Sequence, residues 1–304
     1  MNSFSKSLRL MGNNFTITVV SEDRITADCH IDIAIAEIQR IEKLFTTFDP
    51  NSQTNLINEY AGIKPVVVDE EVFKLIERSI TISNLTQGAF DITYGSIDKG
   101  LWNFDTNMTA LPSHEIAKKM VYLINYRNII LNKEQLSVML LNKGMRIGFG
   151  GIGKGYAAEM AKKKLVERNV LSGIINASGD LTTWGTQASG KPWTIGIAHP
   201  DHPSSAVSCL NISGKAIATS GNYEKCIIIN GKKFSHTIDP KTGFPVTGIK
   251  SVTVISNNAE LADAMAASIA VMGIMPGLFM IDQILDVHCL IIDDKNQIYT
   301  SQNI

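Results

Sequence analysis

The sequence has few cysteines and no long apolar segment. Its cysteines, Cys29, Cys209, Cys226 and Cys289, lie far apart and form no C-x-x-C pair, so neither a zinc site nor a disulfide framework is indicated. Scattered cysteines are typical of a reducing compartment. No apolar run is long enough for a membrane helix, and residues 1–10 lack the apolar core of a signal peptide. The chain as written is therefore expected in the cytoplasm, and a periplasmic or membrane-anchored location would require a leader that had been removed.

The chain also has no excess of positive or negative side chains. The chain has 28 Lys and Arg against 29 Asp and Glu, a formal net charge of -1. This balance gives no basic footprint for nucleic acid and no polybasic patch for a membrane surface. Repeats, low-complexity tracts and an evident linker are absent as well. With 304 residues, 44% of them hydrophobic, the composition is that of a globular protein, and we expect residues 1–304 to form a single domain.

Hydrophobic periodicity predicts helices at the beginning and the end of the chain, with hairpins between them. The expected helices are 25–45, 72–80, 112–125, 154–168, 260–272 and 278–285. The expected strands are 15–20, 128–131, 135–141, 145–149, 173–176, 193–198, 216–219, 225–229, 251–255, 287–293 and 297–300. This order favours an α+β fold over a doubly wound α/β sheet.

A glycine-rich segment, G-F-G-G-I-G-K-G, occupies residues 148–155 between a predicted strand and a predicted helix. Glycines allow backbone N–H groups to approach an anion at a helix N-terminus, and Lys154 adds positive charge. The segment nearly matches a P-loop, but Gly155 replaces the hydroxyl residue that would bind Mg²⁺. Residues 289–294 resemble a Walker B strand. A P-loop NTPase is therefore one alternative, and a purely structural turn is another.

Two hydroxyl-rich segments, Thr219–Tyr223 and Phe234–Pro245, flank a short hairpin. His236 and Asp239 are three residues apart on the second segment, so in an extended chain they would point to opposite faces. They share a site only if the chain bends at Pro240 and Gly243. Such a group of residues could bind phosphates and move a proton. The alternative is a polar surface hairpin with good turn chemistry.

Three further segments contain candidate site residues. Asp263 lies in an apolar, small-residue helix, where a buried carboxylate needs a charge partner or a metal; alternatively, it complements the helix dipole. In residues 88–93, G-A-F-D-I-T, Phe90 could pack on a ring and Asp91 could meet a ribose or phosphate. The alternative there is a helix cap followed by core residues. Residues 176–180, N-A-S-G-D, are suited to a ligand-binding turn or a simple Asx turn.

Taken in order, these segments resemble the FAD:protein FMN transferase family, also called the ApbE family. The resemblance runs from Met11-Gly12 through S-Q-T-N-L-I-N at residues 52–58 to A-D-A-M-A-A at 262–267. The T-S-G-x-Y and S-H-x-I-D-P-x-T-G pair is highly specific. The resemblance implies an α+β fold with mixed or antiparallel sheets and flanking helices, forming two intermeshed lobes around an FAD cleft.

The resemblance also implies an activity and its partners. Members cleave FAD with Mg²⁺ and attach FMN to a Thr or Ser hydroxyl of an acceptor protein, releasing AMP. Acceptors are typically subunits of membrane redox complexes or periplasmic flavoproteins, and no nucleic acid is involved. Some members hydrolyse FAD instead. By position, Asp263 and the main-chain carbonyl of Gly153 are the implied metal ligands, and His236 and Asp239 are the implied catalytic residues. The positions that match FAD-lining segments are Met11, Asn55, Phe90, Asp91, Lys154, Asn176, Asp180, Ser220 and Tyr223.

The chain departs from the family pattern at three positions. Ala267 stands where the family usually has a Thr that is a further metal ligand. Ser268 is next to it but about 100° round the helix, so it is a poor substitute. Gly148 and Ser178 occupy positions where an acid and a glycine are usual. These departures leave two alternatives to transfer: an FAD pyrophosphatase and a catalytically weak FAD-binding protein.

Overall fold

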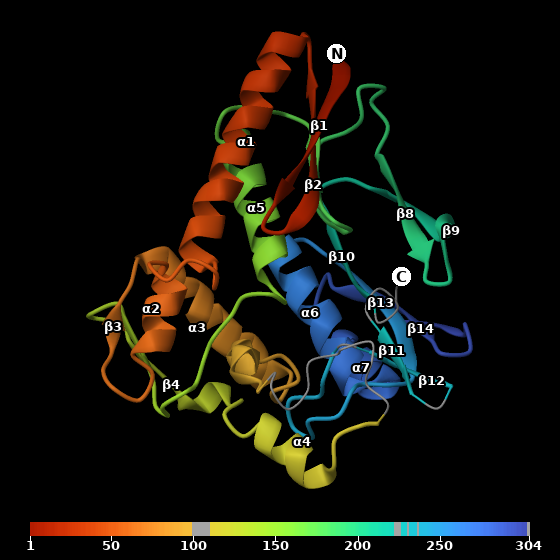
Figure 1. Ribbon diagram of the computed structural model, residues 1–304. Helices are drawn as coiled ribbons and strands as arrows, with labels where there is room; N and C mark the ends of the chain where they lie inside the picture. Colours follow the sequence, from red (N-terminus) through yellow and green to blue (C-terminus); the bar gives the residue numbers. More distant parts are fainter. Residues whose placement is uncertain (99–109, 222–225, 230, 236, 303–304) are drawn as a thin grey trace.

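The core of the structure is an eight-stranded sheet in which every strand pair is antiparallel (Figure 1). The computed structural model describes residues 1–98, 110–221, 226–229, 231–235 and 237–302. The strands, in sheet order, are β1 (Asn2–Leu10), β2 (Asn13–Ser21), β6 (Gly173–Ala177), β7 (Asp180–Trp184), β10 (Ala216–Gly221), β13 (Ile249–Ser256), β14 (His288–Asp293) and β15 (Ile298–Thr300).

Three helices pack beside one another on one face of this sheet: α1 (Arg24–Phe45), α5 (Gly153–Val166) and α6 (Ala259–Met272). Apolar side chains at helical spacing bury α1, as the sequence predicts; Ile31, Ile38 and Ile41 are fully buried. The hairpin of β8 (Trp193–His199) and β9 (His202–Ile212) packs through apolar side chains on residues of the central strands. The sheet is therefore covered on both faces at its centre.

A second group of elements lies below α1 and beside α6 (Figure 1). It contains a small antiparallel sheet in the order β3-β5-β4 and a two-stranded ladder of β11 and β12. Its elements are α2 (Gln53–Glu59), β3 (Val66–Val67), α3 (Glu70–Leu85), the 3₁₀ helices η1 (Ile92–Ser96) and η2 (Tyr126–Asn128), α4 (His114–Met120), β4 (Ile129–Asn132), β5 (Ser137–Leu140), β11 (Cys226–Ile229) and β12 (Lys232–Ser235). The remaining helix, α7 (Ile274–Ile281), packs on α6 and β14. The predicted α+β class is confirmed.

Most predicted elements are confirmed within a few residues, but one predicted strand is wrong. Residues 145–149 form no strand because their main-chain groups bond elsewhere: Arg146 N–H donates to Ser96 Oγ, Ile147 N–H donates to Asn58 Oδ1, and Gly148 N–H donates to the Ile92 carbonyl. These bonds fix the segment beside η1 and α2. Side-chain acceptors far away in the sequence leave no local pattern, so periodicity misses them.

Two predicted helices have different ends. The helix expected over 112–125 begins as predicted, with Ser113 Oγ accepting from Ile116 N–H, but it ends at Met120. Asn125 instead caps η2. The helix expected over 278–285 is α7, which begins directly after Gly273; Gly273 has a φ of 90° and closes α6. Pro276 is tolerated in the first turn of α7, where its missing N–H is not needed.

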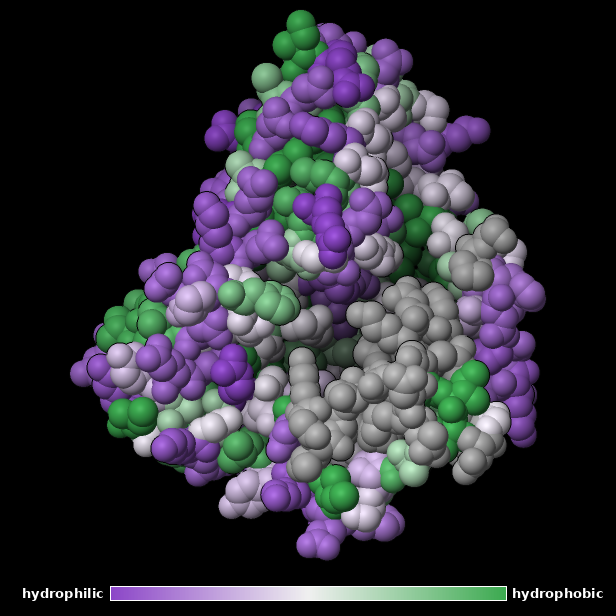
Figure 2. Space-filling model, viewed as in Figure 1, coloured by the Kyte–Doolittle hydropathy of each residue, from purple (hydrophilic) through white to green (hydrophobic). Residues whose placement is uncertain are grey.

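The molecular surface is hollowed near the centre of the face shown in Figure 2, below the part formed by α1 and the β1–β2 hairpin. Within the described residues, no helix has the combination of length and apolar composition that crossing a bilayer requires. The single domain expected over residues 1–304 stays a prediction.

Candidate functional site

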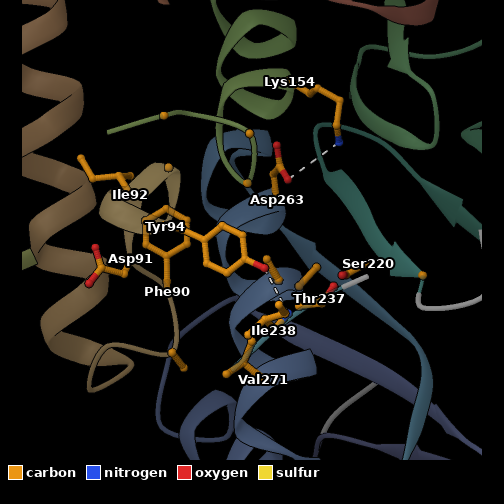
Figure 3. A pocket seen from close by; sticks show the side chains of 18 of the residues that line it. Phe90, Asp91, Ile92, Tyr94, Lys154, Ser220, Thr237, Ile238, Asp263 and Val271 are labelled. Atoms are coloured by element: carbon orange, nitrogen blue, oxygen red, sulfur yellow. Dashed lines mark hydrogen bonds and ion pairs between the residues drawn. The ribbon is translucent and has the colours of Figure 1, made fainter. Parts of the chain in front are cut away.

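A cavity of about 470 Å³ lies where η1, the N-terminus of α5, β10 and α6 meet. Figure 3 shows side chains from these elements converging on it. Its lining residues are Ala89, Phe90, Asp91, Ile92, Tyr94, Gly95, Gly148, Gly150, Gly151, Lys154, Thr219, Ser220, Gly221, Thr237, Ile238, Asp263, Ala266, Ala267 and Val271. Its volume suits a small-molecule ligand.

The only cationic side chain among these lining residues is Lys154, in the first turn of α5. Lys154 Nζ forms an ion pair with Asp180, at the start of β7. Asp180 also accepts from the main-chain N–H of Thr219 on β10, at 3.1 Å. Asp180 therefore connects α5 with two neighbouring strands and holds the ammonium group at the cavity wall.

Asp263 on α6 is the carboxylate opposite this ammonium group. Asp263 is 6% exposed. Its Oδ2 accepts from Gly155 N–H at 3.0 Å, and its Oδ1 lies 3.9 Å from Lys154 Nζ. Burial raises the pKa of Asp263, while the Lys154 charge and the Gly155 hydrogen bond oppose that rise. One carboxylate oxygen thus faces the cavity with only a distant charge partner.

This arrangement fits a hard divalent cation. Mg²⁺ is commonly held by one or two carboxylates, with waters and substrate phosphates completing its shell. Among the described residues no three His, Cys, Asp or Glu side chains form a cluster that could hold a metal ion, so these side chains alone provide no complete ligand set here. Ala267 lines the same cavity and offers no hydroxyl. Ser268 is no replacement, because its buried Oγ donates to the Ala264 carbonyl at 2.6 Å.

The opposite wall comes from residues 89–95. Phe90 lines the cavity, and Tyr94 Oη accepts from the main-chain N–H of Ile238 at 3.1 Å. Burial raises the pKa of Tyr94, so it stays a neutral hydroxyl. Figure 3 shows this bond joining η1 to the segment that follows β12. Tyr94 thereby fixes the chain at Ile238, two residues after position 236.

Asp91 also lines the cavity, but its carboxylate oxygens are bound within the protein. Oδ1 accepts from Thr93 N–H at 2.8 Å and Thr93 Oγ1 at 2.6 Å, and Oδ2 accepts from Tyr126 N–H at 2.8 Å. Burial raises the pKa of Asp91, against the effect of these bonds. We infer that Asp91 shapes the wall and connects η1 with η2.

The structure brings together only some of the predicted site residues. Phe90, Asp91, Lys154, Ser220 and Asp263 line the cavity, and Asp180 contacts Lys154. Gly153, the other predicted metal ligand, is buried at the first position of α5. The predicted residues His236 and Tyr223 lie outside the described residues.

Other predicted residues do not line the cavity. Met11 lies near Gly153, Asn55 Nδ2 donates to the Asp49 carbonyl, and Asn176 Oδ1 accepts from Gly179 N–H in the β6–β7 turn. The carboxylate of Asp239 accepts from Lys241 N–H and Thr242 Oγ1, so it organises the turn at Pro240. The site roles of these residues stay predictions.

Sequence reasoning missed Tyr94, Ile238 and Ala266 as lining residues. Tyr94 follows the G-A-F-D-I-T segment directly, and a buried Tyr requires a hydroxyl partner, so extending that segment by one residue would have found it. Ile238 and Ala266 had no such signal, because apolar residues at these positions are equally expected in a core.

The glycine-rich segment has a packing role that the P-loop comparison does not predict. A Cβ at Gly155 would overlap the Ala259 carbonyl and lie 2.9 Å from the Asp263 Cβ, so only glycine allows α5 to approach α6 this closely. The position where a P-loop carries its Mg²⁺-binding hydroxyl is thus occupied by a helix contact. This contact argues against a P-loop at residues 148–155.

A family model described as "ApbE family" matches residues 11–291. The chain belongs to the ApbE family. Among curated relatives, a Klebsiella pneumoniae (strain 342) protein named FAD:protein FMN transferase is 30% identical over 300 residues, covering 98% of this chain and 92% of that protein. A Treponema pallidum (strain Nichols) protein of the same name is 26% identical, with 100% and 88% covered. The predicted family membership is confirmed.

Solved structures of ApbE proteins share the fold. The ApbE protein of Thermotoga maritima superposes with a TM-score of 0.89 at 28% identity, covering 99% of this chain and 97% of that one. The flavinyl transferase ApbE of Pseudomonas stutzeri, in its apo form, gives 0.85 at 22% identity, covering 99% and 96%. The second similarity is evidence for the fold alone.

Proposed function

We propose that this ApbE-family protein transfers FMN from FAD to a Thr or Ser hydroxyl of an acceptor protein and releases AMP, with Mg²⁺ as cofactor. The observation that carries the proposal is the buried Asp263 carboxylate next to the Lys154 ammonium group, in a cavity at the N-terminus of α5. Relatives along nearly the whole chain are named FAD:protein FMN transferase.

The reaction breaks the phosphoanhydride bond of the diphosphate and forms a phosphoester bond. The acceptor hydroxyl oxygen bonds to the FMN phosphorus, the bond from that phosphorus to the bridging oxygen breaks, and AMP leaves with that oxygen. The hydroxyl proton passes to a base, for which we propose His236. Bound Mg²⁺ would neutralise charge on the diphosphate oxygens. Asp263 and the Gly153 carbonyl would hold the ion.

The other lining residues would position the substrate. Lys154 supplies a fixed positive charge for a phosphate oxygen, and its ion pair with Asp180 keeps it at the wall. Phe90 offers an aromatic face to a ring. Asp239 and Tyr94 would act indirectly, because their hydrogen bonds fix residues 238–241, which follow position 236. An acceptor such as a subunit of a membrane redox complex is compatible with this proposal.

Calorimetry with FAD and with ATP tests the nucleotide class. We expect FAD to bind far more tightly than ATP in the presence of Mg²⁺, since Gly155 provides no P-loop hydroxyl. Micromolar binding of ATP without a response to FAD would instead favour the NTPase alternative. Release of FMN and AMP without an acceptor would favour an FAD pyrophosphatase.

A further inference from the structure

A hydrogen-bond network outside the cavity joins α5, β7 and α6, the same three elements that meet at the ion pairs of Lys154. Glu159 on α5 is at its centre. Glu159 Oε2 accepts from Thr182 Oγ1 on β7 at 3.2 Å and from the main-chain N–H of Ala259, the first residue of α6, at 3.1 Å. One carboxylate oxygen therefore connects α5 to both of its neighbours.

The residues that Glu159 binds share their faces with the two carboxylates at the cavity. Ala259 and Asp263 are four residues apart on α6, so they lie on one face of that helix. Asp180 and Thr182 are two residues apart on β7, so they lie on one face of that strand. Glu159 thus holds the face of α6 that presents Asp263 and the face of β7 that presents Asp180.

Lys162 completes the network. Lys162 Nζ lies 3.0 Å from Glu159 Oε1 and donates to Thr182 Oγ1 at 3.2 Å. The side chains of Glu159 and Lys162 are only 14% and 16% exposed. The Thr182 hydroxyl accepts from the lysine and donates to the glutamate, so each polar group has a partner. A largely buried and satisfied network of this kind holds its members more firmly than an exposed ion pair does.

The relative position of α5 and α6 sets the gap between Lys154 and Asp263. Lys154 Nζ is 3.9 Å from Asp263 Oδ1, which is too far for a hydrogen bond, so this oxygen remains available to a ligand. A shift of α6 toward Lys154 would close the gap, and the ammonium group would then take the place of a metal ion. A shift of α6 away from α5 would break the bond from Gly155 N–H to Asp263 Oδ2.

We propose that Glu159 is a positioning residue for the Mg²⁺ site. By fixing α6 and β7 against α5, it keeps one oxygen of Asp263 free of Lys154. The inference rests on the proposed Mg²⁺-dependent transfer. Glu159 is not among the residues that line the cavity, so it acts through Asp263 and not on the substrate.

The test compares Glu159→Ala with Glu159→Gln in the full-length protein. Gln keeps an oxygen that can accept from Ala259 N–H, whereas Ala has none. Calorimetry with Mg²⁺ alone should show about tenfold weaker binding for Glu159→Ala, and Glu159→Gln should restore most of the affinity. FAD affinity, measured with a chelator, should change less than about twofold in both variants. In metal-free protein with isotope-labelled glycine, the Gly155 amide should exchange with solvent about tenfold faster in Glu159→Ala.

Glu167→Ala is the matched control. Glu167, at the end of α5, also faces a lysine three residues away, with 3.9 Å between Lys164 Nζ and Glu167 Oε2, but its side chain is 52% exposed. This variant should bind Mg²⁺ as the parent does.

Equal Mg²⁺ affinities of the parent and Glu159→Ala would overturn the inference. So would a parallel loss of Mg²⁺ and FAD affinity, because it would indicate general loosening of the fold. A parent that binds no Mg²⁺ would overturn the inference together with the proposed metal site. If the parent binds Mg²⁺ and Glu159→Ala weakens that binding, but no acceptor is modified, the transferase function alone fails and the positioning role stands.

Discussion

Replacing Ala267 by Thr should add a ligand to the proposed Mg²⁺ site. Ala267 and Asp263 are four residues apart on α6 and line the same cavity, so a hydroxyl at 267 would lie on the Asp263 face of the helix. There is space for it, because the facing residue is Gly151, where even an added Cβ would lie 3.8 Å from the Ala267 Cβ.

The expected gain is modest. A fixed hydroxyl would replace a water that the ion otherwise has to hold, and immobilising a water costs up to about 2 kcal/mol. Taking about 1 kcal/mol, Mg²⁺ affinity should rise about fivefold. AMP release from FAD should then increase at limiting Mg²⁺ and stay unchanged at saturation, because Mg²⁺ accepts water in its octahedral shell.

The assay is AMP release as a function of Mg²⁺ concentration, with Ala267→Val as a control of similar shape without the hydroxyl. The Val variant should not tighten Mg²⁺. Superimposable curves for Ala267→Thr and the parent would refute the reasoning. That result would mean that the new hydroxyl donates to the main chain one turn earlier, as Ser268 Oγ does to the Ala264 carbonyl.

Three further changes test the site's construction. Asp263→Asn should abolish Mg²⁺-dependent AMP release. Because burial raises the pKa of Asp263 in the folded protein, the unfolding free energy of the metal-free parent should also fall relative to that of this variant as the pH rises above 3.8. A difference in unfolding free energy that does not change with pH in urea titrations would argue against this. Asp91→Asn replaces one carboxylate oxygen by an NH₂ group, so either Thr93 N–H or Tyr126 N–H loses its acceptor, which should cost about 1–3 kcal/mol in the same titrations; an unchanged midpoint would remove Asp91 from its structural role. Gly155→Ala overpacks the α5–α6 contact and should cost about 1–3 kcal/mol, whereas Gly150→Ala, with nothing within 4 Å, should cost far less; equal costs would contradict the packing argument.

Local patterns in the sequence were enough to predict much of the fold. The period-2 alternation of β2 and the apolar stripe of α1 follow directly from which side chains are buried. β1 and β9 were missed because most of β1 is exposed, and β9, His202–Ile212, is largely polar, so neither shows a buried stripe. Their pairing depends on partners that only the folded chain supplies.

The candidate site was partly predictable for a similar reason. Asp263 and Lys154 are conspicuous, because a charge in an apolar helix and a lysine after glycines each demand an explanation. Their proximity was not predictable from the residues alone, since it depends on Gly155 allowing α5 to contact α6. For Asp91, the sequence indicated the right segment but not the role of the residue. Its hydrogen bonds with Thr93 and Tyr126 are visible only in the structure.

The central claim is that Asp263 and Lys154 serve the transfer of FMN to a protein hydroxyl. The most direct measurement is the intact mass of a Thr-containing acceptor after incubation with the protein, FAD and Mg²⁺, with AMP quantified in the same sample. We predict an acceptor adduct of one FMN and one AMP released per adduct, both lost with a chelator or with Asp263→Asn. Free FMN and AMP in equal amounts without an adduct, or no AMP at all, would contradict the account.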